Sequence, residues 1–152
     1  MNLVTHCLRT FAAAALSAAS VFAVGAVQAA EPASFSVAQM AGSWRMAFSG
    51  FTGCGNTSML MDVTLAQDGR SVNGVLTQHG SCGDSVLAGQ AFRIESLSSD
   101  GSGTAAMGCG DSCGWNLIIQ VSRDRQTFNM VDVDPINPGN YISGVAVKRQ
   151  QP

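Results

Sequence analysis

After residue 40, apolar and polar residues alternate with a period of two, not the 3.6 of an amphipathic helix. In the stretch 57–66 every second residue is a large apolar one: Met59, Met61, Val63 and Leu65. The stretch 114–122 repeats the pattern. The alternation predicts β-strands at 42–50, 57–66, 71–79, 86–97, 103–108, 114–122, 126–133 and 140–148, preceded by a short helical turn at 37–40.

The connections between these strands form two sets. Short turns rich in Asp, Gly, Ser and Arg follow the second, fourth and sixth strands, whereas every cysteine after residue 40 lies in a loop of the other set. In an up-and-down meander alternate loops emerge at the same end, so this arrangement brings the cysteines together. The predicted fold is therefore all-β, an up-and-down antiparallel barrel of about eight strands.

Residues 1–29 have the features of a secretory signal peptide. A short basic start with Arg9 precedes an apolar, Ala-rich run, and small residues at 27–30 favour cleavage after Ala29. A membrane anchor is the alternative, but the run is mostly Ala and leads directly into an acidic segment. We therefore expect residues 30–152 to form a single exported domain, periplasmic or secreted, with no membrane contact after cleavage.

Four cysteines remain after the signal: Cys54, Cys82, Cys109 and Cys113. An even count in an exported chain favours two disulfides. Four cysteines allow three pairings. We favour Cys109 with Cys113, because they bracket a three-residue loop, and this leaves Cys54 and Cys82 as the second pair. A metal site built from these thiols and His79 is the alternative, but the paired C-x-x-C spacing of structural zinc is absent.

Composition excludes several classes of function. Charged residues are 12% of the chain, and the net charge of −2 becomes −3 when Arg9 leaves with the signal, so binding to nucleic acid is not expected. The mature chain has a single histidine, His79, without a nucleophile elbow or metal motif around it. We therefore predict a protein that is not an enzyme and needs no cofactor or metal.

A barrel of this size holds either packed side chains or one small ligand. At the cysteine-bearing end, which we call the mouth of the barrel, the inward positions of the strands are large apolar residues and a few polar ones, as in a small-molecule pocket. These are the candidate ligand-binding residues: Phe48, Met59, Gln78, Met107, Trp115, Asp132 and Tyr141. In the last strand the more apolar face is the one with Tyr141, Val145 and Val147, which predicts that these residues face inward.

The start of the first strand, Gly42-Ser43-Trp44, resembles the Gly-x-Trp signature that opens lipocalins and other calycins. Arg149 follows the last strand, where lipocalins often place an arginine that packs on this tryptophan. The resemblance implies a lipocalin-like barrel over residues 40–149, with Trp44 as a plug at the closed end. In size the chain is nearer to avidin-like barrels and to bacterial metalloprotease inhibitors, and it lacks the pocket tryptophans that would support biotin binding.

Two functions remain. The protein is either a carrier of a small apolar molecule in the barrel mouth, or an inhibitor or adhesion module that binds an extracytoplasmic protein through its disulfide-stapled loops. A cavity above about 300 Å³ beside Trp115 favours the carrier. A filled barrel with ordered, protruding loops around Cys54 and Cys82 favours the protein binder.

Overall fold

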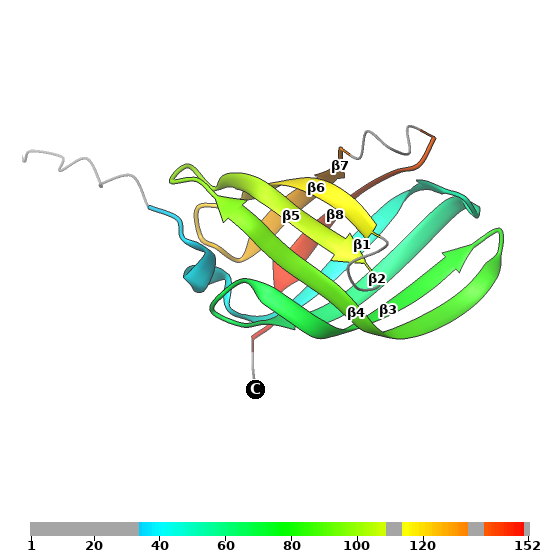
Figure 1. Cartoon of the computed structure of the whole chain (residues 1–152), viewed down its shortest axis with the longest axis horizontal. Coiled ribbons are helices and arrows are strands. Elements are labelled where there is room, and N and C mark those ends of the chain that lie inside the picture. The colour runs from blue at the N-terminus through cyan, green and yellow to red at the C-terminus, as the bar shows by residue number, and fades with distance from the viewer. Residues whose placement is uncertain (1–33, 109–113, 134–138, 151–152) are drawn as a thin grey trace, which may run out of the picture.

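The computed structural model describes residues 34–108, 114–133 and 139–150. Its eight antiparallel strands form a closed barrel in which each strand pairs with its neighbours in sequence and β8 returns to β1 (Figure 1). The all-β, up-and-down prediction is confirmed. The signal peptide and the Cys109–Cys113 pair fall outside the described residues.

All the predicted strands are present, with bounds within a few residues of those expected. A 3₁₀ turn, η1 (Val37–Met40), precedes them, as predicted. The strands are β1 (Gly42–Thr52), β2 (Gly55–Leu65), β3 (Arg70–Gly80), β4 (Gly83–Leu97), β5 (Ser102–Gly108), β6 (Gly114–Val121), β7 (Thr127–Asp132) and β8 (Tyr141–Lys148).

One end of the barrel is closed by the N-terminal segment. Trp44 is fully buried there, and its Nε1–H donates to the carbonyl of Met40 in η1 at 2.7 Å. The edge of its ring meets Phe128 with the centroids 4.9 Å apart. The Arg125 guanidinium lies 5.6 Å from the ring centroid of Phe35, which is also buried. The predicted role of Trp44 as a buried plug is therefore confirmed, and we call this the closed end.

The cation beside Trp44 is not the expected one. Lys148 places its Nζ 5.5 Å from the Trp44 ring centroid, whereas Arg149 contacts Asp62 with its Nη1 at 3.5 Å. Lys148 is the ladder partner of Trp44, so both side chains leave the same face of the sheet. Arg149 is one residue further along and turns to the outer face.

At the opposite end a disulfide joins two hairpins. Cys54 and Cys82 are bonded, with their Cα atoms 5.2 Å apart, and the Ser81 N–H donates to the Cys54 carbonyl at 3.1 Å. The predicted pairing of these two cysteines is confirmed. The β4–β5 ladder begins only at Ala91 among the described residues, so the first half of β4 extends beyond β5 together with β3. We call this the stapled end.

The interior is one cluster of buried apolar side chains that runs from Phe35 and Met40 to Met59 and Met107. Inward positions were predicted correctly on most strands, but the prediction for β8 was wrong by one residue. Ile142 and Ala146 are buried there, while the side chains at 141, 145 and 147 are exposed.

The reason is volume. Gly144 lies between Phe48 and Met130 in the ladders, and Ala146 lies between Met46 and Phe128. A Cβ atom at Gly144 would stand 2.9 Å from Cδ1 of Phe48. At positions 144 and 146 these large neighbours leave room only for small residues, whatever the hydropathy of the other face of β8.

The positions of β4 that face the interior also shift by one residue near the stapled end. Phe92 and Ile94 face the core as expected. Continued alternation from these two residues predicts that Ala88 also faces inward, but the partner of the inward Leu76 is Leu87. The ladder shifts register here and Gly89 has a φ of +72°. A β-bulge therefore moves the pattern by one residue.

Candidate functional site

The predicted mouth residues lie on the expected strands, but three of the seven are packed in the core. Phe48, Met59 and Met107 expose 3% or less of their surface and belong to the core cluster. Phe48 is the ladder partner of Met59, which is in turn the partner of Gln78, and Met107 pairs with Trp115. The structure thus brings the predicted residues into neighbouring positions, with the three large apolar ones already surrounded by protein.

The other mouth residues divide into two groups. Gln78, Trp115 and Asp132 are half-buried, and Trp115 packs against the core cluster. Tyr141 lies on the outside of the barrel and is 61% exposed, so it is not part of the inner surface. It was misplaced by the same one-residue error that affects all of β8.

On the outer face Tyr141 stacks on Phe51, with ring centroids 6.4 Å apart and planes 20° from parallel. Phe51 is 41% exposed and lies just before the disulfide turn. The pairing of the strands extends this surface across β8, β7 and β6. Val131 on β7 is the partner of Ser143, which lies between Tyr141 and Val145 on β8, and Ile118 on β6 is the partner of Val131. We call these five large side chains the outer patch: Phe51, Ile118, Val131, Tyr141 and Val145.

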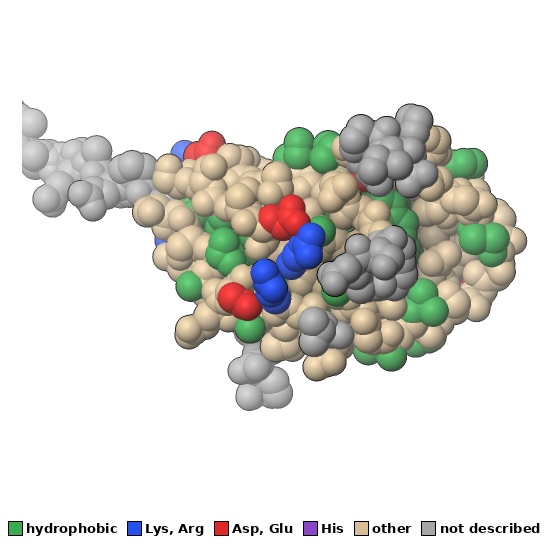
Figure 2. All heavy atoms as spheres, in the orientation of Figure 1, with side chains coloured by type: hydrophobic (Ala, Val, Ile, Leu, Met, Phe, Trp, Pro, Cys, Tyr) green, Lys and Arg blue, Asp and Glu red, His purple; other side chains and the backbone are tan. Residues whose placement is uncertain are grey.

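Charged side chains gather elsewhere on the surface. Arg93 forms an ion pair with Glu95 at 2.9 Å. In the β3–β4 ladder Arg93 is the neighbour of Arg70, which lies 4.0 Å from Asp68. Figure 2 shows charged side chains gathered in a short row on the visible face, with apolar side chains around it. The outer patch contains no charged residue, and this separates it chemically from that row.

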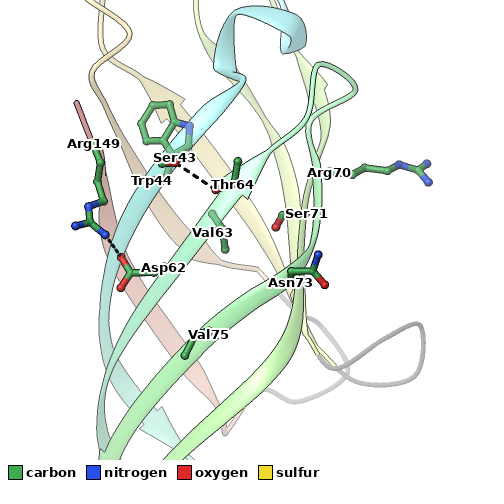
Figure 3. Close-up of a pocket in the computed structure, with 10 residues that line it drawn as sticks. All are labelled: Ser43, Trp44, Asp62, Val63, Thr64, Arg70, Ser71, Asn73, Val75 and Arg149. Atoms are coloured by element: carbon green, nitrogen blue, oxygen red, sulfur yellow. Dashed lines mark hydrogen bonds and ion pairs between the residues drawn. The ribbon is translucent and has the colours of Figure 1, made fainter. Parts of the chain in front are cut away.

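A cleft opens through the barrel wall between β2 and β3, nearer the closed end (Figure 3). The ladder stops at Asp62 and Val75, and the strands meet again where the Ala66 N–H donates to the Arg70 carbonyl at 2.9 Å. Between these points β2 has the three residues 63–65 and β3 the four residues 71–74. The extra residue prevents continuous pairing and leaves a cleft of about 590 Å³.

The rim of this cleft carries an ion cluster. Asp62 accepts two hydrogen bonds from Arg45, both 2.9 Å long, and a third of 3.5 Å from Arg149. The hydrogen bonds from Arg45 lower the pKa of the Asp62 carboxyl, against a smaller opposing effect of burial. Ser43 and Thr64 hydrogen-bond to each other beside it at 3.2 Å. Sequence patterns did not indicate this site, because its cause is a mismatch in strand length.

The residues weighed for catalysis and metal binding have other partners in the structure. His79 contacts Asp84 on the neighbouring strand, and both side chains are about four-fifths exposed, as expected of a solvated pair. Cys54 and Cys82 are held in a disulfide and cannot act as thiolate ligands. Within 34–108, 114–133 and 139–150 there is no group of three or more residues of the metal-binding types.

Comparisons with known proteins find no match, either to a family model or to a curated protein. The closed eight-stranded barrel agrees with the architecture of calycins, and this agreement is one of fold alone. Among the described residues no helix has the length and apolar character needed to span a membrane.

Proposed function

We propose that this protein is an exported, non-enzymatic, calycin-like barrel that binds another extracytoplasmic protein through its stapled end, as an inhibitor or adhesion module. The observation that carries the proposal is the exposed Phe51–Tyr141 stack next to the disulfide-linked hairpins. Aromatic side chains are enriched in the centres of protein interfaces. A disulfide supports export, because such bonds persist in oxidising compartments.

The packing of the interior favours this proposal over a carrier. Three of the predicted ligand-binding side chains, Phe48, Met59 and Met107, are almost fully buried by other protein groups. The described cleft of about 590 Å³ lies in the β2–β3 wall and does not include Trp115 in its lining. A ligand in the mouth would therefore have to displace core side chains, at a cost in packing energy.

Rigidity also supports a binding role at this end. The strands β1 and β2 pair without interruption from Gly42↔Leu65 to Thr52↔Gly55, and the disulfide ties their turn to that of β3–β4. Binding by a surface that is already ordered loses less conformational entropy than binding by a flexible loop. The exposed aromatic pair is thus presented on a preorganised framework.

The test is capture of partners by the immobilised mature protein from the extracytoplasmic fraction of its host. The same experiment is done with Tyr141→Ser and with Val147→Ser, a control that removes another exposed apolar residue from β8 outside the patch. We expect a saturable partner that binds the wild type and the control and loses at least about tenfold in affinity with Tyr141→Ser. Equal binding by both variants would contradict the assignment of the outer patch.

A second measurement tests the carrier. Apolar fluorescent probes are titrated into the wild type and into Trp115→Phe. Saturable binding that changes Trp115 emission would favour a ligand in the mouth and would count against the packed interior as the reason for choosing a protein partner.

A further inference from the structure

The wall cleft is lined by a serine whose side chain is largely buried. Three polar side chains are buried in the described part of the chain: Thr52, Thr57 and Ser71. Thr52 and Thr57 hydrogen-bond to each other at 3.0 Å. Ser71 is 8% exposed and lines the cleft. Figure 3 shows that it points toward the gap between β3 and β2.

The Ser71 hydroxyl lines a cleft that opens to solvent. It can therefore hydrogen-bond to water or to a polar atom of a ligand that enters the cleft. Ser71 is held in place because it is the ladder partner of Phe92, a core residue of β4. The hydroxyl is therefore fixed at the inner end of the cleft.

The outer rim is positively charged: Arg70 and Arg149 both line the cleft, with Asp62 as the acidic residue in the lining. Asp62 is shared by Arg45 and Arg149, so the cluster has one positive charge in excess. Arg45 is fully engaged in a two-bond pair with Asp62, whereas Arg149 makes one long contact of 3.5 Å and its side chain is 54% exposed. The guanidinium of Arg149 therefore has donors left for an incoming anion.

Apolar surface lies between these two polar points. Val63, almost fully buried, and Val75, 42% exposed, line the cleft together with Trp44. The volume of about 590 Å³ falls within the range of about 300–1,000 Å³ typical of small-molecule sites. The cleft thus combines an anion-binding rim, an apolar middle and a hydroxyl at its inner end.

We propose that the β2–β3 wall cleft binds a small organic monocarboxylate. Its carboxylate pairs with Arg149, its apolar body packs on Val63 and Val75, and a polar atom of the ligand hydrogen-bonds to Ser71. A monoanion fits better than a dianionic phosphate, because Asp62 stands 3.5 Å from the same guanidinium and repels the second charge. The site is independent of the proposed protein-binding function, since it lies in the other half of the barrel.

The experiment follows the backbone amides and the Trp44 Nε1–H by NMR during titration with 3-methylbutanoate. Its neutral amide, 3-methylbutanamide, and isobutyl phosphate are the comparison probes. We expect saturable shifts at Trp44, Val63 and Ser71 with the carboxylate, and at least about tenfold weaker binding of the amide, because the bond to Arg149 loses its charge. The phosphate should bind more weakly than the carboxylate at neutral pH.

Variants test whether Arg149 is the residue that binds the carboxylate. Arg149→Gln should weaken binding of 3-methylbutanoate about tenfold or more, and Arg149→Lys should restore most of it. Ser71→Ala should weaken binding of a ligand that carries a second polar group, such as 3-hydroxybutanoate, and leave 3-methylbutanoate unaffected. The matched control is Arg123→Gln, because Arg123 is an exposed arginine in the turn between β6 and β7.

Four outcomes would overturn the proposal: no saturable shift, equal binding of the amide, tighter binding of the phosphate, or an equal loss in Arg123→Gln and Arg149→Gln. Melting temperatures of all variants are measured alongside. Arg149 and Arg123 are both on the surface, so each variant should remain folded and the binding data should be interpretable.

Discussion

The two ends of this barrel are held together by different interactions. At the closed end, aromatic and apolar side chains of Phe35, Met40, Trp44 and Phe128 fill the opening and are almost completely buried. At the stapled end a covalent bond between Cys54 and Cys82 holds the hairpins, and large apolar side chains such as Tyr141 lie outside in solvent. One end is stable through packing and the other through a crosslink.

The difference separates stability from interaction. A side chain that is buried in the core cannot also contact a partner, so the closed end is suited to holding the fold together. The disulfide lowers the entropy of the unfolded chain and does not require its neighbours to be buried. The stapled end can therefore expose Phe51 and Tyr141 without losing its order. The following predictions test this division, from the largest expected effect to the smallest.

Trp44→Ala should have the largest effect. The side chain is fully buried, so its loss should lower the free energy of unfolding by about 3–5 kcal/mol. Trp115→Ala, which truncates the half-buried tryptophan near the stapled end, should cost less, about 1–2 kcal/mol. Urea denaturation measures both. If Trp115→Ala costs as much as Trp44→Ala, the two ends do not differ in the way that we describe.

Removing the disulfide should have the second largest effect. Cys54 and Cys82 are 28 residues apart in sequence, and in the chain-entropy model the double variant Cys54→Ala/Cys82→Ala loses about 3–4 kcal/mol. Hydrogen exchange should rise first in the turns at 53–56 and 80–83, while amides of η1 and the start of β1 stay protected. Equal loss of protection at both ends would mean that the crosslink stabilises the barrel as a whole.

Asp62→Asn should have a small effect that depends on pH. Arg45 lowers the pKa of Asp62 in the folded protein, so this pair contributes stability above the ordinary carboxyl pKa of 3.8 and loses it as pH falls through the lower folded value. Because both side chains are about half exposed, we expect the variant to lose less than about 1 kcal/mol at pH 7.

The stability difference between wild type and Asp62→Asn should shrink below about pH 4. Thermal unfolding at pH 7 and pH 3 measures it, with Asp68→Asn as a surface control near the same end. A difference that grows toward acid pH would show that Asp62 is not held in its charged form by Arg45.

Tyr141→Ser should have the smallest effect on stability. The side chain is 61% exposed, and substitutions of this kind usually change stability by no more than about 0.5 kcal/mol. Val147→Ser on the same strand should behave in the same way. If Tyr141→Ser destabilises the protein by 2 kcal/mol or more in chemical denaturation, the outer patch is part of the folding core and the division between the two ends fails.

Local pattern alone determined much of this protein. Period-two alternation placed all the strands, and the position of each cysteine in one set of loops predicted the Cys54–Cys82 bond. The burial of Trp44 followed from the resemblance of Gly42-Ser43-Trp44 to the opening of calycin barrels. These features depend on local alternation, on turn chemistry and on the parity of loops, all of which are properties of the chain order.

Tertiary structure decided the features that depend on space. The inward face of β8 is the one with Ile142 and Ala146, because Phe48 and Met130 fill the volume beside Gly144. The exposure of Tyr141 follows from that choice. The wall cleft arises because three residues of β2 face four of β3, a mismatch that appears only when both ladders are aligned. Hydropathy along one strand contains no information on the size of side chains across the barrel, and this is why packing decided what the pattern could not.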